Sequence, residues 1–439
     1  MALLLFALYW VLLLSPLAVL ALAGALHGGH GLVSEIGRTM GLLGFMILML
    51  QVFLVARFKP LTRPFGLDMV VRFHRNMALI ALGMLVLHPV LMAAGEGHWE
   101  LLYSLRLPWY ILLGKLCLLL VVISVAMGLF QRRRSIAFEH WRLAHDLLGP
   151  AILAGVFVHS LNAGHDLHQP TLQVWWYLAL AAAAVVFTWH RLARPALLAR
   201  RAWAVERVRA ETDEATTVEL APPAGEEPYS HLPGQFHFLT PLDAEGLPRQ
   251  EHHFTISSSP ERKDVRASTI KALGDFTSRV SNLRPGNRVA VHGPFGRFSH
   301  TLHPDERELV FIAGGIGITP VMSMLRHLRD TGTTTPVTLF YANPDLNQAV
   351  FRRELEDMAE QGSPKLTLVH VLKQPPEGWR GETGHISREM LMRHLAEGMD
   401  GRGFYLCGPP GLLAAARLIL REMGVADNRI HAEVFRFLD

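Results

Sequence analysis

The sequence predicts an α-helical membrane bundle of six spans, followed by an antiparallel β-barrel domain and a doubly wound α/β domain. Half of the 439 residues are hydrophobic, and most of the long apolar runs end before about residue 193. The later part alternates short strand-like segments with glycine-rich turns, which is typical of globular domains. More than one domain is expected at this length, and we place the boundaries at 1–200, 201–302 and 303–439.

Charge and cysteine content argue against two classes of function. The net charge is only +4, and the basic residues cluster beside apolar segments, which indicates membrane topology and no nucleic-acid binding. Cys117 and Cys407 are the only cysteines and lie far apart in the sequence. A disulfide framework or a cysteine-ligated metal site is therefore not expected. Histidine is abundant, with 23 residues, and this is the unusual feature of the composition.

Six apolar segments are long enough to cross a lipid bilayer. The first has no basic segment before it, so we interpret it as a retained span, with a signal anchor as the alternative, and not as a cleaved signal peptide. Six spans place both ends of the membrane domain on the same side. The segments lie at about residues 2–24, 39–57, 74–94, 109–130, 143–160 and 172–190.

Basic residues are concentrated in the loops on one side of these spans. The loops on the opposite side hold mainly Arg38 and Arg106. By the positive-inside rule the basic side is cytoplasmic, so the large C-terminal part is expected to be cytoplasmic too. The basic residues of that side are Arg57, Lys59, Arg63, Arg72, Arg75, Arg132, Arg133, Arg134, Arg142, Arg191, Arg194, Arg200 and Arg201.

Two of the spans carry histidine pairs with the same spacing. His74 and His88 bound one apolar stretch, and His145 and His159 bound another. Fourteen residues of helix advance about 21 Å and turn through about 1400°, roughly 40° short of four turns, so each pair shares one helix face at two depths. Spans three and five both run outward from the cytoplasm. His74 should therefore lie level with His145, and His88 with His159.

Two opposed histidine pairs at two depths suit two haems, each held between two neutral imidazoles. Ionisable residues inside a membrane are rare and usually functional. The alternative is that each histidine hydrogen-bonds a neighbouring helix, but the repeated spacing in two parallel spans favours the haem interpretation. Gly83, Gly149 and Gly155 lie between the histidines. They either leave room for the macrocycles or allow close helix packing.

The segment after Arg201 has the alternation of β-strands. Residues 202–223 predict two paired strands joined by a turn, and LPGQFHFLT follows as another strand. EHHFTISSSP, residues 251–260, combines a strand with hydroxyls that suit a flavin ring or a phosphate, although a plain barrel rim has the same pattern. ALGDFTSRV, residues 272–280, predicts a turn that leads into a helix, whose N-terminus would attract a pyrophosphate. VAVHGPFGRF, residues 289–298, predicts a strand and a Gly-Pro turn.

A glycine-rich loop begins the last domain. Residues 308–313 predict a buried parallel strand, and the glycines after it form a turn that a ligand can approach closely. Thr319 is expected to be the N-cap and Pro320 the first residue of the next helix, whose N-terminus would face a phosphate.

Further strands are predicted at 336–343, 366–372 and 404–411, with helices between them. This pattern gives a doubly wound sheet with the ligand at the carboxyl ends of the strands. Each glycine turn alone is ordinary loop geometry, but three such turns in one domain favour a nucleotide site.

Taken in order, these motifs resemble those of the prokaryotic NADPH oxidase and ferric reductase family over nearly all of the chain. The matching motifs are the paired histidine spacing, HHFTISS at 252–258, GDFT at 274–277, GGIGITP at 314–320, CGPP at 407–410 and the terminal EVFRF. The resemblance implies a six-span ferric-reductase-like domain with two haems b, an FAD-binding barrel and an NAD(P)-binding domain. It also implies a multi-pass protein of the bacterial inner membrane.

The resemblance assigns roles to individual residues. Thr255 would approach the flavin ring and His252 its pyrophosphate. Cys407 would lie near the nicotinamide, while Phe435 would stack on the flavin and Glu433 would help to orient it. The residues expected to bind FAD are His252, Phe254, Thr255, Ser257, Ser258, Gly274, Asp275, Phe276 and Thr277. Those expected to bind NAD(P) are Gly314, Gly315, Gly317, Thr319, Pro320, Cys407, Gly408 and Pro409. Haem iron is expected between His74 and His145 on the inner side, and between His88 and His159 on the outer side.

Two positions depart from the family pattern. His253 replaces the usual proline of the flavin motif, which leaves the local loop conformation open. After the second strand of the last domain, YANPDLNQ has no arginine before Arg352 and Arg353 to pair with a 2′-phosphate. The expected nucleotide is therefore NADPH, with NADH as the alternative.

The expected function is transfer of electrons from cytosolic NAD(P)H through FAD and the two haems to an acceptor outside. Dioxygen, giving superoxide, is the first candidate, because it needs only the haem edge and a cation such as Arg38 or Arg106. Ferric or cupric ions are the alternative. A third alternative is a subunit that feeds electrons to a membrane or periplasmic partner. The outer-loop candidates for metal ligands are His27, His30, His98, His165 and His168, with Glu96, Glu100 and Asp166 nearby.

Overall fold

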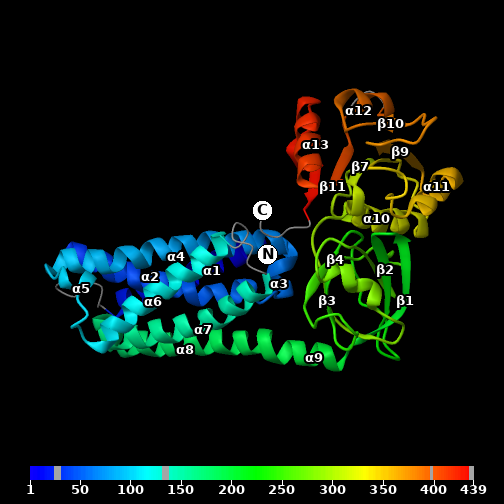
Figure 1. The fold of residues 1–439 in the computed structure, drawn as a ribbon. Helices are drawn as coiled ribbons and strands as arrows, with labels where there is room; N and C mark the ends of the chain where they lie inside the picture. The colour runs from blue at the N-terminus through cyan, green and yellow to red at the C-terminus, as the bar shows by residue number, and fades with distance from the viewer. Residues whose placement is uncertain (24–30, 131–137, 396–398, 435–439) are drawn as a thin grey trace. The chain divides into compact units, whose positions relative to one another are not determined.

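The computed structural model describes residues 1–23, 31–130, 138–395 and 399–434. By its internal contacts the chain separates into two compact units, the first from Met1 to Ala193 and the second from Arg194 onward. The described part of the first unit is helical, and both β-sheets lie in the second (Figure 1).

Six helices of the first unit are long and apolar enough to cross a membrane, as the sequence predicts. Several helices begin before the predicted spans, for example α4, which begins at Leu67 and not at 74. This extra segment carries Asp68 and Arg72, which are too polar for the hydrocarbon layer but suit the headgroup region. The long helices are α1 Ala2–Leu22, α2 Leu32–Val55, α4 Leu67–Glu96, α6 Trp109–Phe130, α7 Phe138–Ala163 and α8 Pro170–Thr188. The short ones are α3 Lys59–Phe65, α5 Glu100–Tyr103, η1 His165–His168, the π-helical turn η2 Trp189–Ala193 and α9 Arg194–Arg200.

Two glycines on α2 allow this helix to pack closely against α4. A Cβ atom on Gly41 would lie 2.9 Å from the His88 ring, and one on Gly44 would lie 2.9 Å from the Leu85 side chain. Small residues at such spacing let two helices approach each other inside a membrane. The close α2–α4 contact therefore seats the His88 ring directly on the α2 backbone.

The first half of the second unit is an antiparallel barrel, as predicted. Its six strands pair in the order β4-β3-β6-β1-β2-β5, and an isolated antiparallel bridge between Ile256 and Ser268 joins the two ends of this order. The predicted helix after 272–280 is shorter than expected, because Thr277–Asn282 forms a 3₁₀ segment, η3. The strands are β1 Trp203–Thr212, β2 Ala215–Ala221, β3 Phe236–Pro241, β4 His252–Thr255, β5 Arg266–Lys271 and β6 Arg288–Phe295.

The second half of this unit is a parallel sheet in the order β10-β9-β8-β7-β11-β12. From β7 the chain moves strand by strand to β10 on one side, and then returns to β11 and β12 on the other. The order therefore reverses between β7 and β11, where a doubly wound sheet binds its ligand. The strands are β7 Glu308–Gly314, β8 Val337–Asn343, β9 Leu366–Leu372, β10 Glu382–Thr383, β11 Arg402–Cys407 and β12 Ile430–Glu433.

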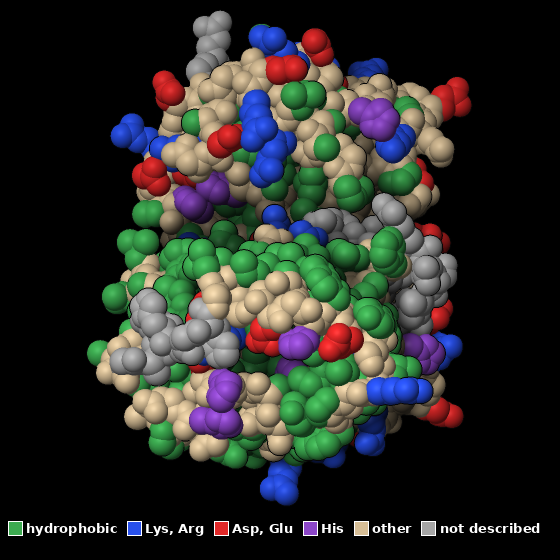
Figure 2. Space-filling model, turned by 90° about the vertical axis from the view of Figure 1, so that its left-hand side faces the viewer, with side chains coloured by type: hydrophobic (Ala, Val, Ile, Leu, Met, Phe, Trp, Pro, Cys, Tyr) green, Lys and Arg blue, Asp and Glu red, His purple; other side chains and the backbone are tan. Residues whose placement is uncertain are grey.

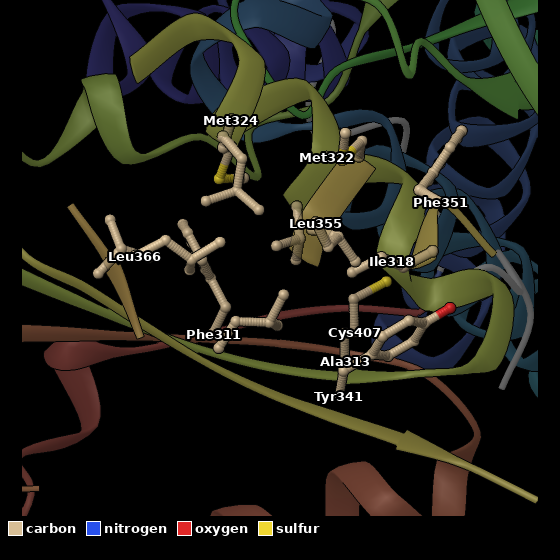
Figure 3. Packing of buried hydrophobic residues seen from close by; sticks show 14 of the residues in the cluster. Phe311, Ala313, Ile318, Met322, Met324, Tyr341, Phe351, Leu355, Leu366 and Cys407 are labelled. Carbon is tan, nitrogen blue, oxygen red and sulfur yellow. The ribbon is translucent and has the colours of Figure 1, made fainter. Parts of the chain in front are cut away.

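Helices cover both faces of this sheet, which confirms the doubly wound prediction. Helices α10 Ile318–Asp330 and α11 Arg352–Gln361 contribute Met322 and Leu355 to a core that includes Phe311 and Tyr341 (Figure 3). Helices α12 Arg388–His394 and α13 Pro410–Glu422 pack on the alternate residues of the same strands, such as Ile312. Because successive strand side chains point to opposite faces, the continuous apolar run of β7 serves both cores.

Candidate functional site

The structure brings the four membrane histidines together in the pairs that the spacing predicts. The ring centres of His74 and His145 lie 6.3 Å apart, and those of His88 and His159 lie 6.5 Å apart. The ring planes of the two pairs cross at 79° and 76°. An iron atom bound at about 2 Å by one nitrogen of each ring would separate the ring centres by roughly 6 Å. Both pairs therefore fit the spacing that a haem iron needs.

Hydrogen bonds orient three of these rings. His88 donates from Nδ1 to the Gly37 carbonyl and His159 donates from Nδ1 to the Tyr110 carbonyl, each at 2.8 Å. A carbonyl can only accept, so Nδ1 carries the proton in both rings and Nε2 is left as the metal-binding atom. The Ser124 hydroxyl lies 3.1 Å from Nδ1 of His145 and orients that ring in the inner pair. The sequence reasoning missed Gly37, Tyr110 and Ser124.

Glycines divide into those that hold the histidines and those that leave space. A Cβ on Gly114 would lie 2.7 Å from the His159 ring. The absence of a side chain at Gly114 therefore lets the helix backbone contact the His159 ring, as it does at Gly41 for the His88 ring. Of the three predicted glycines, Gly155 would meet Cys117 and so serves helix packing. In the described part of the chain, Gly149 has no atom within 4 Å of its Cβ position, and it lies one turn from His145 on the same helix face, which suits a cradle for a macrocycle.

The third predicted glycine does not belong to this cradle. Gly83 also has open space at its Cβ position. Nine residues separate it from His74, and this turns it about half a helical turn away from the histidine face. Its open side therefore faces away from the paired rings.

The end of the first unit that carries α5 and η1 holds histidines and carboxylates among hydrophobic side chains (Figure 2). The rings of His165 and His168 lie 5.3 Å apart on η1, and His98 pairs with Glu100 at 3.4 Å. Arg38, one of the two predicted cations, is not free, because Asp166 and Glu35 both bind its guanidinium. Arg106 is exposed. His27 and His30 lie outside the described residues.

The predicted flavin motif runs along β4 and into the core of the barrel. Thr255 ends the strand and is buried, with only 8% of its surface exposed. The Ser257 hydroxyl bonds to Thr269 at 3.0 Å, and the Ser258 hydroxyl accepts a hydrogen bond from the Ala267 amide at 3.0 Å. These two hydroxyls therefore brace β5. A ligand at this position would meet the backbone of the motif more readily than its serine side chains.

The two motifs expected to bind the flavin pyrophosphate lie side by side. The His252 ring stacks on Phe276 with 3.8 Å between ring centres, and Phe254 lies nearly parallel to Phe276 at 6.3 Å. The Thr277 hydroxyl accepts hydrogen bonds from the amides of Leu273 and Gly274. The rest of this turn is open among the described residues, since Asp275 is exposed and the Cβ position of Gly274 meets none of their atoms within 4 Å. This open turn beside His252 fits a bound phosphate.

A buried polar network that the sequence reasoning missed crosses the barrel. The His237 ring bonds to the Tyr229 hydroxyl through Nδ1, and to the Ser268 hydroxyl at 2.7 Å through Nε2. Arg266 donates to the Tyr229 carbonyl at 2.8 Å. Burial lowers the pKa of His237 to about 3, and burial with the nearby Arg266 lowers the pKa of His231 to about 3. Both rings are therefore neutral at neutral pH.

The glycine loop and the loop after β11 pack against each other at the point where the strand order reverses. A Cβ on Gly317 would lie 2.8 Å from the Gly408 Cα, and one on Gly314 would lie 2.9 Å from Pro409. Gly317 is required by a contact with backbone atoms, and Gly314 by a contact with side chains. Gly315 differs, because its φ is +52° and its Cβ position meets no atom of the described residues within 4 Å. The open side of the loop, where a ligand can approach, is therefore at Gly315.

The predicted cap of the following helix is wrong in its position. Gly315–Gly317 forms a 3₁₀ turn, so α10 begins at Ile318 with Gly317 as its N-cap. Thr319 lies inside the first turn, and its hydroxyl donates to the Ile316 carbonyl at 3.1 Å. Pro320 is correspondingly the third helical residue. The helix N-terminus still follows the glycine turn directly, so the expected phosphate position moves by only two residues.

Cys407 ends β11 and is fully buried in the core beneath α10, beside Ala313 and Ile318 (Figure 3). Burial raises the pKa of its thiol well above the ordinary value, with a further contribution from Glu433. Glu433 is the register partner of Cys407 on β12. The thiol is therefore neutral and not a nucleophile. Phe435 lies outside the described residues.

Within the described part of the chain, one further group has the composition of a metal site. His303, Glu306 and His431 bring three ligand atoms within 4.8 Å of one another. The buried Glu306 carboxylate already accepts hydrogen bonds from the Tyr405 hydroxyl at 2.6 Å and from His431 at 2.7 Å. The His303 ring stacks on His431 at 3.9 Å. We interpret this cluster as a structural one, whose hydrogen bonds hold the segment before β7 against strands β11 and β12.

Comparison with known proteins gives matches for both units. Residues 40–156 match the ferric reductase like transmembrane component, and residues 311–418 match the oxidoreductase NAD-binding domain. NADH-cytochrome b5 reductase 1 of Lodderomyces elongisporus is 30% identical over 208 residues, which are 43% of this chain and 69% of the relative.

Two other matches each cover about half of this chain. The glycine betaine monooxygenase reductase subunit of Pseudomonas aeruginosa is 34% identical over 46% of this chain, and the match spans only 56% of that relative. The FAD/NAD-binding domain of a nitric oxide dioxygenase from Vibrio cholerae matches with a TM-score of 0.46 and 24% identity, over 53% of this chain and 98% of that one.

Fold and family matches define the class of protein: a multi-pass membrane protein whose second unit contains a domain of the oxidoreductase NAD-binding type. A ferric-reductase-like transmembrane component joined to a barrel and an NAD-binding domain is the architecture of the NADPH oxidase and ferric reductase family. The chain belongs to that family.

Proposed function

We propose that the chain transfers electrons from cytosolic NAD(P)H across the bacterial inner membrane to an acceptor on the outer side, with FAD and two haems b as carriers. The observation that carries this proposal is the presence of two opposed histidine pairs in a membrane unit whose chain continues into a reductase unit. When bound, FAD would take a hydride from the nicotinamide, and the haems would pass single electrons across the bilayer.

In this proposal His74 and His145 ligate the inner iron, and His88 and His159 ligate the outer iron. The histidines of the outer pair are held by backbone carbonyls, which fix both rings with Nε2 as the ligand atom. In the inner pair, Ser124 orients His145. The reductase unit would place the flavin along β4, with its pyrophosphate at the turn 274–277. The dinucleotide would lie across the loops at Gly315 and Gly408.

Dioxygen is the proposed acceptor, with superoxide as the product, because it requires no binding site beyond access to the outer haem edge. The ion pairs of Arg38 leave Arg106 as the exposed cation of the original two candidates. One observation favours a ferric or cupric ion as the second candidate acceptor. The adjacent rings of His165 and His168 on η1 offer imidazole nitrogens on the outer side.

The test uses the purified full-length chain in detergent with FAD and haem. We expect two haems per chain by pyridine haemochrome assay, and the loss of one of them in His88→Ala or His159→Ala. His98→Ala, in an outer loop, is the matched control and should retain both. Two haems that remain in every histidine-pair variant would overturn the proposed ligands.

The acceptor is tested separately, by NADPH or NADH oxidation in air with cytochrome c, with and without superoxide dismutase. Cytochrome c reduction that dismutase abolishes supports dioxygen as the acceptor. Haems that are reduced anaerobically but reoxidise slowly in air would contradict it. Ferric chelates would then be tested, with His165→Ala and His168→Ala as the first variants.

A further inference from the structure

In a doubly wound sheet, residues at the end of the strand that corresponds to β8 contact the adenine-bearing ribose of the dinucleotide. In such sheets a carboxylate at this position binds the ribose hydroxyls of NAD, whereas an arginine accommodates the 2′-phosphate of NADP. Strand β8 lies next to β7, with Ala342 in register with Gly314. Asn343 and the residues after it therefore lie beside the open glycine, Gly315.

A cavity connects the glycine loop, the end of β8 and the rim of the barrel. Asn343 and Gln348 line it from the β8 end, and Gly315 lines it from the glycine loop. Lys271 and Glu214 line it from the barrel side. It therefore lies at the edge of the sheet where the dinucleotide is proposed to bind.

Asn343 is a buried amide that points to a missing partner. Its side chain is only 3% exposed. Among the residues that the structure describes, neither its oxygen nor its nitrogen makes a hydrogen bond of acceptable geometry, although the Tyr341 hydroxyl lies close enough to interact with the amide. A buried amide that lacks partners is unfavourable, and ribose hydroxyls can both donate to its oxygen and accept from its nitrogen. The amide is therefore suited to a sugar at this point.

Asp345 places a fixed negative charge two residues further on. Its carboxylate accepts hydrogen bonds from the Asn347 amide at 2.8 Å, the Gln348 amide at 3.2 Å and the Gln348 side chain at 2.8 Å. These bonds hold the carboxylate in place at the end of β8. The side-chain bond from Gln348 lowers the pKa of Asp345 below its ordinary value, so the group is ionised at neutral pH.

Two cations near this position, Lys271 and Arg352, are paired with carboxylates, whereas Arg353 on α11 is exposed. Among the described residues that line the cavity, Lys271 is the one cation, and its ammonium lies 3.0 Å from Glu214. Arg352, the next arginine in the sequence, pairs with Glu356 at 2.8 Å. A 2′-phosphate would bring about two negative charges toward Asp345, with no free cation in the cavity lining to offset them.

We propose that Asn343 and Asp345 bind the adenine-bearing ribose and that the chain uses NADH in preference to NADPH. This inference rests on the proposed function, since it names the nucleotide of the same site. It replaces the sequence-based expectation of NADPH. The negative charge at the end of β8 discriminates against the phosphorylated ribose, whereas the Asn343 amide binds the sugar hydroxyls.

The experiment measures kcat/KM for NADH and for NADPH with the full-length, FAD-loaded chain in detergent. Ferricyanide is the acceptor, so that electrons are collected whether or not haem is bound. We expect a preference for NADH of about tenfold or more. Asp345→Asn keeps an oxygen acceptor for the turn but removes the charge. It should reduce the preference at least threefold, mainly through a lower KM for NADPH.

Two further variants separate charge from loop structure. Glu214→Gln frees Lys271 without touching β8 and should also lower the KM for NADPH. Asn343→Ala should raise the KM for both nucleotides and leave their ratio unchanged. Asp357→Asn, an exposed carboxylate on α11, is the matched control and should change neither quantity.

The outcomes distinguish this inference from the proposed function. Equal or better use of NADPH by the unmodified chain overturns the nucleotide preference while leaving the electron-transfer proposal intact. A preference for NADH that both Asp345→Asn and Glu214→Gln leave unchanged overturns the assignment of these residues. Failure of both nucleotides to reduce ferricyanide would count against the proposed function itself.

Discussion

At the scale of single residues, the membrane site is defined by which atoms the histidine rings touch. The Gly37 and Tyr110 carbonyls decide that Nδ1 carries the proton in His88 and His159. Gly41 and Gly114 let the neighbouring helices approach until they touch these rings. A ring held by a hydrogen bond on one atom and by backbone contact on one side has few rotamers left, so the outer pair is preorganised for a metal.

This tight seating predicts that Gly114→Ala impairs the outer pair. The new methyl group would lie 2.7 Å from the His159 ring, so the ring must turn and its Nε2 leaves the ligating position. If the histidine pairs bind haem as proposed, the content should fall from about two haems per chain to about one. Pyridine haemochrome assay of the purified chain measures it. Gly128→Ala on the same helix meets open space and should keep both haems. Equal haem content in the two variants would contradict the seating role.

At the scale of secondary-structure elements, the nucleotide edge depends on two loops that share one packed contact. Strands β7 and β11 are parallel neighbours, so the loops that follow them emerge side by side. Gly317 and Gly408 are close enough that a side chain on Gly317 would overlap backbone atoms. Backbone cannot move aside as a flexible side chain can, and the geometry of one loop therefore sets that of the other.

We expect Gly317→Ala to destabilise the second unit and to weaken nucleotide binding. The methyl group would lie 2.6 Å from the Cys407 carbonyl carbon and 2.8 Å from the Gly408 Cα, and overpacking of this kind costs about 1–3 kcal/mol. Thermal release of FAD, followed by its fluorescence, reports the stability, and the KM for NADH reports the loop. Gly411→Ala, on α13 in open space, is the control. An unchanged release temperature and KM in Gly317→Ala would show that the two loops adjust independently.

The elements that the sequence predicted well are those with a repeating local pattern. The fourteen-residue histidine spacing, the strand alternation and the order of β7, loop and α10 follow from residues close together in the chain. The partners on other helices do not, because nothing near His145 indicates Ser124, and nothing near His88 indicates Gly37. The cap at Thr319 failed because a local preference competed with the 3₁₀ turn of Gly315–Gly317, which starts the helix earlier. The charge at Asp345 was visible, but its fixed orientation required the structure.

At the scale of the whole molecule, acid sensitivity is expected to come from the barrel and not from the surface. His231 and His237 are 5% and 0% exposed, and the pKa of each is lowered to about 3. In the unfolded chain both would titrate near pH 6.5. Between these values the unfolded state binds more protons than the folded state. Their contribution to stability is therefore complete above about pH 6.5 and is lost progressively as the pH falls toward 3.

This linkage predicts a falling stability of the second unit in a window where carboxylates are still ionised, from pH 6.5 to pH 5. Each buried histidine removes up to about 1.4 kcal/mol per pH unit below its unfolded pKa, so the FAD-release temperature of the full-length chain should drop across the window. His237→Gln can keep hydrogen bonds to Tyr229 and Ser268 but does not titrate. Its release temperature should therefore fall less steeply with pH, even if it starts lower. His385→Gln, at an exposed loop position, should follow the slope of the unmodified chain. A release temperature that stays constant from pH 6.5 to 5 in the unmodified chain would show that these rings are protonated without cost, and that the barrel interior is open to water.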